Sequence, residues 1–306
     1  MDNFADRLIN AIERKGTAAT IALDPVFSNL PVDIRDRADQ GSADSQLSAI
    51  GEYARAVIDI VAPLVSVVKI NSAYFEAYGP WGVALYHDLI EYAKRCPDVI
   101  VIGDVKRGDI GHTAQMYALG HLGGPALGKH ALADAITISG YFGEDGIAPF
   151  VDAAAANGRG VFVLVRTSNP SAAGLQDLVL SDGRKVDEIV AAQVEKSASQ
   201  PRLIGERDYS SVGAVVGTRG AADAAKLRIM MPKSFFLAPG YGAQCGKAED
   251  FRPYFNRDGL GALVLAGRSV IYAYENPEHR GSASWQNAVE SACKDFVAAI
   301  APLSRR

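Results

Sequence analysis

The sequence predicts a single-domain (β/α)8 barrel, the TIM-barrel fold, over residues 1–306. Three observations predict it. Eight short apolar runs rich in β-branched residues recur along the chain, helical patterns lie between them, and the composition allows a large buried core. An alternating series of this kind can also form an open, doubly wound sheet, but eight near-regular units favour closure into a barrel.

The predicted elements follow one another in a regular order. Residues 1–16 place Phe4, Leu8, Ile9 and Ile12 on one helical face, which predicts an amphipathic lead-in helix. The apolar runs predict strands at residues 17–23, 64–70, 98–105, 133–139, 160–166, 212–217, 234–240 and 260–267. Helical patterns between and after the strands occupy residues 82–95, 188–198, 219–230 and 284–300.

Two longer polar segments interrupt this rhythm, at residues 25–45 and 197–211. Because the strand and helix series resumes after each one, we expect surface insertions rather than linkers between domains. Asp182 and Gly183 carry the Asp-Gly signal of a tight hairpin, which we expect to decorate the fifth βα connection.

Charge and cysteine content argue against several classes of protein. A formal net charge of −4 disfavours a dedicated binder of nucleic acid or anionic membranes, although a small phosphate pocket stays compatible. Cys96, Cys245 and Cys293 are odd in number and lack CxxC spacing, so neither a disulfide framework nor a thiolate metal site is expected. No run is long enough to span a bilayer and the first residues lack a signal peptide's apolar core, so we expect a cytoplasmic protein.

Polar residues stand where the predicted strands end, which is the catalytic face of a (β/α)8 barrel. They are Asp24, Lys69, Asp104, Lys106, Ser168, Asn169 and Arg268. Asp104 and Lys106 share a strand face and should meet inside the barrel mouth. Flanked by Asp104 and Asp109, Lys106 should stay protonated and act as a proton donor. A structural ion pair would explain the same residues, but convergence with Lys69 and Asp24 favours catalysis.

The last two strands are followed by glycine-rich turns, where barrels often bind phosphate. Gly240 and Gly242 follow the seventh strand, and Gly267 and Arg268 follow the eighth. Glycine permits close approach of an anion to backbone N–H groups, and arginine offers a forked pair of donors. Glycine more often serves only a tight turn, but this location favours a phosphate site.

Other catalytic motifs are missing from the sequence. The five histidines show no metal-binding pair such as HExxH, so no metal site is predicted, and His112 is expected to be structural or to support a neighbouring site residue. Ser168 lies in no GxSxG elbow, which argues against a serine hydrolase. The aromatic stretch that begins at Tyr74 is interpreted as packing.

The segment DVKRGDI, residues 104–110, resembles the DxKxxDI signature of the orotidine 5′-phosphate decarboxylase family. Further matching segments follow in order over almost the whole barrel: ALD at Asp24, VKI at Lys69, DIGHT to Thr113, TSNPS around Ser168, PGYGAQ to Gln244, and GR at Gly267 and Arg268. The stretch TSNPSAAGLQD and the polar insertions resemble the bacterial subgroup with longer loops.

The resemblance implies decarboxylation of orotidine 5′-monophosphate to uridine 5′-monophosphate without a metal or organic cofactor. Lys106 would stabilise and protonate the carbanion left at ring carbon C6, because that anion has no obvious electron sink. Asp104 would lie near the departing carboxylate. Asp24 and Lys69 would hold the ribose hydroxyls.

The resemblance also implies a homodimer with shared active sites. Asp109 and Thr113 would reach into the site of the neighbouring subunit, and Ser168 would read the pyrimidine edge. The phosphate would be bound by Gln244, Gly267 and Arg268.

Three alternatives stay open at this point. A sugar-phosphate decarboxylase of the same fold would need magnesium and a further acidic ligand, for which Glu76 is the candidate. A Schiff-base aldolase would use Lys69 or Lys106, although neighbouring carboxylates disfavour a neutral amine. A barrel that only binds a nucleotide is the alternative without an activity.

Overall fold

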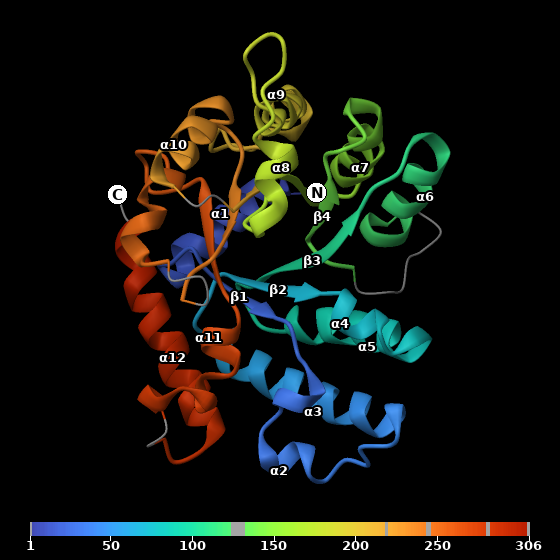
Figure 1. Ribbon diagram of the computed structural model, residues 1–306, viewed down its shortest axis with the longest axis vertical. Coiled ribbons are helices and arrows are strands. Elements are labelled where there is room, and N and C mark those ends of the chain that lie inside the picture. Colours follow the sequence, from blue (N-terminus) through green and yellow to red (C-terminus); the bar gives the residue numbers. More distant parts are fainter. Residues whose placement is uncertain (1, 124–131, 218–219, 243–245, 280–281, 305–306) are drawn as a thin grey trace.

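The computed structural model describes residues 2–123, 132–217, 220–242, 246–279 and 282–304. Within these residues, eight parallel strands close into a barrel in chain order, so the predicted fold is confirmed (Figure 1). The strands are β1 Ala19–Leu23, β2 Val67–Asn71, β3 Ile100–Arg107, β4 Ala135–Ser139, β5 Gly160–Arg166, β6 Val212–Val216, β7 Phe236–Pro239 and β8 Ala262–Ala266. Each strand overlaps the apolar run that predicted it.

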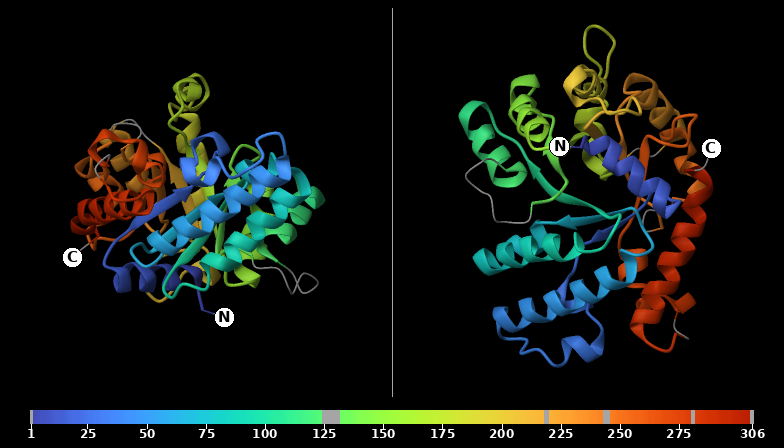
Figure 2. Two further views of the ribbon diagram at one scale, coloured as in Figure 1. Left: turned by 90° about the horizontal axis from the view of Figure 1, so that it is seen from below. Right: turned by 180° about the vertical axis from the view of Figure 1, so that it is seen from behind.

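The helices surround the barrel on its outer side (Figures 1 and 2). They are α1 Phe4–Lys15, α2 Val32–Arg35, α3 Ala43–Val61, α4 Ala73–Glu76, α5 Gly79–Ala93, α6 Gly111–Leu122, α7 Glu144–Ala156, α8 Ala173–Gln176, α9 Val186–Ala198, α10 Ala221–Met230, α11 Arg268–Ile271 and α12 Trp285–Ile300. The four helical patterns read from the sequence correspond to α5, α9, α10 and α12. None of the described helices is long and apolar enough to cross a lipid bilayer.

Helix α1 covers the end of the barrel where the strands begin, as the view from behind shows (Figure 2). The Asn3 side chain caps the helix by accepting a hydrogen bond from the Ala5 N–H at 2.7 Å, and Gly16 ends it at a φ of 68°. The Phe4 ring packs edge-on against Phe162 of β5, with 6.1 Å between ring centroids. The predicted lead-in helix therefore fills the amino-terminal end, and the site lies at the opposite end.

The two polar insertions lie at opposite ends of the barrel. Residues 25–45 contain a short 3-10 helix and α2, and the Val26 N–H donates to the Tyr272 hydroxyl beside β8. Residues 197–211 pack against α1, where the Leu203 carbonyl accepts from Asn3 at 3.0 Å. Leu203 is buried, so part of this second segment belongs to the core.

The predicted hairpin at Asp182 and Gly183 is present. Val179 and Lys185 form an antiparallel bridge, and the Leu180 N–H donates to the Arg184 carbonyl at 2.8 Å. Gly183 has a φ of 84°, a left-handed conformation that glycine adopts without steric cost.

Candidate active site

A cavity of about 310 Å3 opens where the strands end. Seven of the ten site residues predicted from the sequence line it: Asp24, Lys69, Asp104, Lys106, Ser168, Gly267 and Arg268. Asp109 and Thr113 do not line it, and Gln244 lies outside the described residues. The predicted convergence of polar side chains at the carboxyl ends of the strands is thus largely observed.

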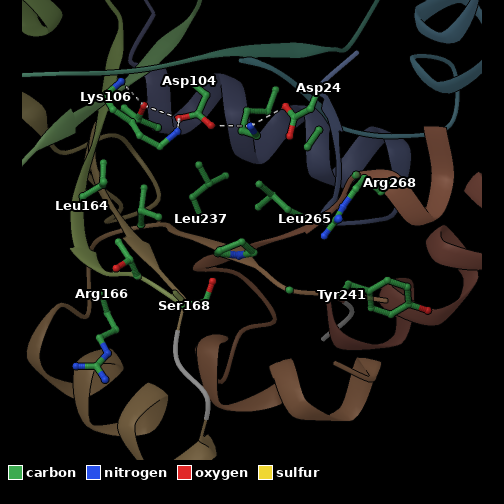
Figure 3. A pocket seen from close by; sticks show the side chains of 18 of the residues that line it. Asp24, Asp104, Lys106, Leu164, Arg166, Ser168, Leu237, Tyr241, Leu265 and Arg268 are labelled. Atoms are coloured by element: carbon green, nitrogen blue, oxygen red, sulfur yellow. Dashed lines mark hydrogen bonds and ion pairs between the residues drawn. The ribbon is translucent and has the colours of Figure 1, made fainter. Parts of the chain in front are cut away.

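Four of these side chains form a row of alternating charges along one wall of the cavity (Figure 3). Asp104 stands between two ammonium groups: its Oδ1 lies 2.6 Å from Lys106 Nζ and its Oδ2 lies 2.6 Å from Lys69 Nζ. Lys69 Nζ lies 3.4 Å from Asp24 Oδ1 at the other end. The Lys69 side chain is 6% exposed and that of Lys106 is 50% exposed, so Lys106 is the ammonium that reaches the open cavity.

The two central residues of the row, Lys69 and Asp104, stabilise each other's charged forms. Burial favours the neutral form of Lys69, but Asp104 and Asp24 outweigh burial and raise the pKa of this lysine. Burial likewise favours neutral Asp104, yet Lys69 and Lys106 lower the pKa of this carboxyl to about 2. Asp104 therefore fixes two ammonium groups and stays an anion between them.

A bulge in β3 brings Asp104 and Lys106 together. In the pairing of β3 with β4, Gly103 lies opposite Ile136 and Arg107 lies opposite Ile138, so three residues of β3, 104–106, span the length of one residue of β4, Thr137. Lys106 has a φ of 45°, in the left-handed region that non-glycine residues rarely adopt. Bulges of this kind re-aim side chains beside active sites. The predicted meeting of Asp104 and Lys106 is confirmed, but an irregular strand end produces it.

The other walls of the cavity differ in chemistry from the charged row. Leu164, Leu237 and Leu265 supply apolar side chains from β5, β7 and β8 (Figure 3). The Ser168 hydroxyl and the Arg268 guanidinium point into the cavity from separate places on its rim (Figure 3). The cavity thus offers a charged wall from which the Lys106 ammonium extends, an apolar middle, and the Arg268 guanidinium as a further cation.

The turn after β7, where the sequence predicted an anion site, contains two glycines with positive φ. Gly240 and Gly242 have φ values of 126° and 71°, so both lie in the region that favours glycine. A Cβ added at Gly242 would lie 2.8 Å from the Ser269 hydroxyl, so space is restricted there as well. Gly267 directly precedes α11, which begins at Arg268. Short helices after the eighth strand commonly complete phosphate sites in barrels.

Asp109 does not flank Lys106 within the chain. Its Oδ1 accepts a hydrogen bond from the Ile110 N–H at 2.8 Å, just before α6 begins. Thr113 is exposed in the first turn of α6. His112 is also exposed there. The expected acidic cage around Lys106 therefore consists, in the described part of one chain, of Asp104 alone.

Several residues of the cavity were missed or misplaced by the sequence reasoning. Tyr74, interpreted as packing, lines the cavity, and burial together with Asp24 raises the pKa of its hydroxyl. Thr137 and Tyr241 line it too. The signal for Thr137 was its place near the end of the fourth strand. Asn169, expected at the rim, instead accepts a hydrogen bond from Thr167 in its own loop.

Glu76, the candidate metal ligand, and Asp177, near the Ser168 loop, each pair with an arginine. Glu76 forms an ion pair with Arg107, and hydrogen bonds from Ser72 and Arg107 outweigh burial and lower its pKa. Asp177 lies at the far end of the loop that carries Ser168. Its two carboxylate oxygens accept hydrogen bonds from the two Arg166 Nη atoms, at 2.8 and 3.0 Å. No group of three or more His, Cys, Asp or Glu side chains suited to a metal ion gathers among the described residues.

A closed parallel barrel with a cavity and a row of charged side chains where its strands end has the architecture of a barrel enzyme. Comparison with known proteins identifies the family. The model of the orotidine 5′-phosphate decarboxylase / HUMPS family matches residues 21–283, and the chain belongs to this family.

Relatives match nearly the whole chain. The orotidine 5′-phosphate decarboxylase of Caldicellulosiruptor bescii is 39% identical over 286 residues, which cover 91% of this chain and 92% of the relative. That of Rhodopirellula baltica is 38% identical over 296 residues, or 95% and 97% of the two chains. A crystal structure of a putative orotidine 5′-phosphate decarboxylase from Streptomyces avermitilis superposes with a TM-score of 0.79 at 29% identity, covering 99% of this chain and 96% of that one.

Proposed function

We propose that this chain decarboxylates orotidine 5′-monophosphate to uridine 5′-monophosphate and CO2 in pyrimidine biosynthesis, without a metal or organic cofactor. The observation that carries the proposal is the Lys106 ammonium, held 2.6 Å from buried Asp104 and half exposed to the cavity. Relatives named orotidine 5′-phosphate decarboxylase over most of the chain support the choice of substrate.

The reaction breaks the bond between C6 and the carboxylate carbon, and the electron pair stays on C6 as CO2 leaves. This pair lies in the ring plane, so the ring's π system does not delocalise it. A fixed cation next to C6 lowers the energy of the developing anion, and Lys106 then donates a proton to C6. The lysine regains a proton from solvent. Asp104 orients Lys106 and lies near the departing carboxylate.

The remaining predicted residues bind the substrate away from C6. Asp24 and Lys69, at the inner end of the charged row, would hold the ribose hydroxyls. Ser168 would read the pyrimidine edge, and the phosphate would be bound by Arg268 and Gly267 together with Gln244. Contacts to a remote phosphate provide binding energy that helps to align the ring against Lys106.

A homodimer with shared sites is part of the proposal. The surface around Asp109 and Thr113 carries apolar side chains that one chain leaves uncovered: Ile110 is 57% exposed, Met116 54% and Tyr141 76%. Exposed apolar groups gathered on one surface mark interaction sites. In a two-fold dimer, Asp109 and Thr113 of each subunit would complete the site of the other. We also propose a cytoplasmic location, which free thiols at Cys96 and Cys293 support.

One assay separates this function from its alternatives. Orotidine 5′-monophosphate absorbance is followed with the wild type and Lys106→Ala, each with and without a chelator. We expect turnover by the wild type in both conditions and a loss of about 100-fold or more in Lys106→Ala. Lys196→Ala, which removes an exposed lysine paired with Glu144, is the matched control and should keep full activity.

A different outcome of this assay, or of two companion measurements, favours the alternatives. Loss of wild-type activity on chelation points to a metal-dependent sugar-phosphate decarboxylase, and trapping by borohydride points to a Schiff base at Lys69 or Lys106. Tight uridylate binding without turnover indicates a nucleotide-binding barrel.

The shared site is tested by mixing subunits. Lys106→Ala and Asp109→Ala dimers should each be impaired. In a mixed dimer one site carries both substitutions and the other carries neither, so random exchange should restore about a quarter of wild-type activity. If subunit exchange is demonstrated and no activity is recovered, the active sites are not shared between subunits.

A further inference from the structure

We propose that Thr137 is a positioning residue that fixes both the backbone of Lys106 and the carboxylate of Asp104. This inference rests on the proposed function for its kinetic test. Thr137 lies on β4, is 1% exposed and faces the three-residue bulge of β3. It is the residue of β4 between Ile136 and Ile138, which pair with Gly103 and Arg107 on either side of the bulge.

The hydroxyl of Thr137 joins the two catalytic residues. Its Oγ1 accepts a hydrogen bond from the Lys106 N–H at 3.0 Å and donates one to Asp104 Oδ1 at 2.8 Å. The same Oδ1 also accepts a hydrogen bond from Lys106 Nζ at 2.6 Å. A closed ring of contacts therefore runs from the Lys106 backbone through Thr137 and Asp104 to the Lys106 ammonium.

The backbone of Lys106 needs such a contact. A left-handed conformation at a residue with a Cβ costs free energy and persists only when surrounding contacts hold it. Arg107, the next residue, is held by its ion pair with Glu76 and by a hydrogen bond to the Val105 carbonyl. Thr137 supplies the corresponding contact at the Lys106 N–H, so the bend that aims the ammonium into the cavity is fixed on both sides.

The position requires a group that accepts a hydrogen bond from the Lys106 N–H and donates one to Asp104, and a hydroxyl meets both requirements. It can accept one hydrogen bond and donate another at the same time, whereas a methyl group of the same size can do neither. Without it the Lys106 N–H and Asp104 Oδ1 each lose a partner next to the cavity. Lys106 would then leave its orientation toward the substrate, while groups that contact ribose, pyrimidine and phosphate stay in place.

The test compares Thr137→Val with Thr137→Ser. We expect kcat to fall about 10- to 100-fold in Thr137→Val, the effect of losing a hydrogen bond to a charged group in a buried site. Thr137→Ser should stay within about threefold of the wild type because it keeps the hydroxyl. The dissociation constant for uridine 5′-monophosphate should change by less than about threefold in both variants.

Thr20→Val is the matched control. Thr20, on β1, is equally buried, and its hydroxyl has no hydrogen-bond partner among the residues the structure describes. This variant should retain wild-type kcat. A Thr137→Val enzyme with wild-type kcat, a Thr137→Ser enzyme as impaired as Thr137→Val, or product binding weakened as much as kcat would each overturn the inference.

Two further measurements keep the test decisive. If Thr137→Val does not fold, Thr137→Ser and Thr137→Ala provide the same comparison of a retained with a removed hydroxyl. A crystal structure of the hydroxyl-free variant gives a readout independent of the substrate: Lys106 should leave the left-handed region. If it keeps its positive φ and its contact with Asp104, the inference is wrong. A wild type that does not decarboxylate orotidine 5′-monophosphate counts instead against the proposed function.

Discussion

Replacing Asp104 by asparagine should make the protein's stability less dependent on acid. The pKa of this carboxyl is about 2 in the folded chain and 3.8 ordinarily. The difference corresponds to about 2 kcal/mol of stabilisation. Because the folded pKa is lowered, this stabilisation is present above pH 3.8 and is lost as the pH falls toward 2. About 1 kcal/mol of it should be gone by pH 3.

The measurement is urea-induced unfolding of the wild type and Asp104→Asn at pH 6 and pH 3. Asparagine resembles the protonated acid. The difference in free energy of unfolding between the wild type and the variant should therefore be about 1 kcal/mol larger at pH 6 than at pH 3. Asp152→Asn is the control, because Asp152 pairs with Arg202 in an exposed ion pair that contributes little. If the difference between wild type and Asp104→Asn does not change with pH, the charged row does not act as described.

Two further predictions concern substrate binding. Arg268→Ala removes a charged donor to the phosphate, so it should raise KM and lower kcat. We expect kcat/KM to fall roughly 10- to 100-fold in steady-state assays. Unchanged kinetics would contradict the assignment of Arg268 to the phosphate. Asp177→Asn breaks the paired contact with Arg166 that closes the Ser168 loop. It should raise KM roughly 3- to 10-fold with kcat nearly constant, and a fall in kcat alone would show that the loop acts on the chemistry instead.

The strand order and the location of the site could be predicted because they depend on local patterns. A strand buried on both faces leaves a run of apolar residues, and a polar residue at its end is conspicuous against that run. Asp24, Lys69, Asp104, Lys106 and Arg268 were found in this way. Their meeting at one rim follows from the parallel barrel alone.

The details of the site could not be predicted because they depend on pairing between strands. The bulge of β3 exists only relative to β4, and Lys106 shows no sign in the sequence of its positive φ, since such positions are usually inferred from glycine. Thr137 looks like any β-branched strand residue until its partner is known. Asp109 appeared to flank Lys106 because it is near in sequence. The chain turns into α6 directly after it, and the Asp109 carboxylate accepts a hydrogen bond from the Ile110 N–H instead of contacting Lys106.

Helix α1 packs against Phe162 and covers the end of the barrel where the strands begin, whereas the described cavity opens where the strands end. Orotidine 5′-monophosphate would have to enter, and CO2 and uridine 5′-monophosphate leave, through the same passage between the charged row and Arg268. A product molecule still seated there excludes the next substrate, so the product is expected to inhibit competitively. The rate at which the product leaves through this passage then sets an upper bound on turnover.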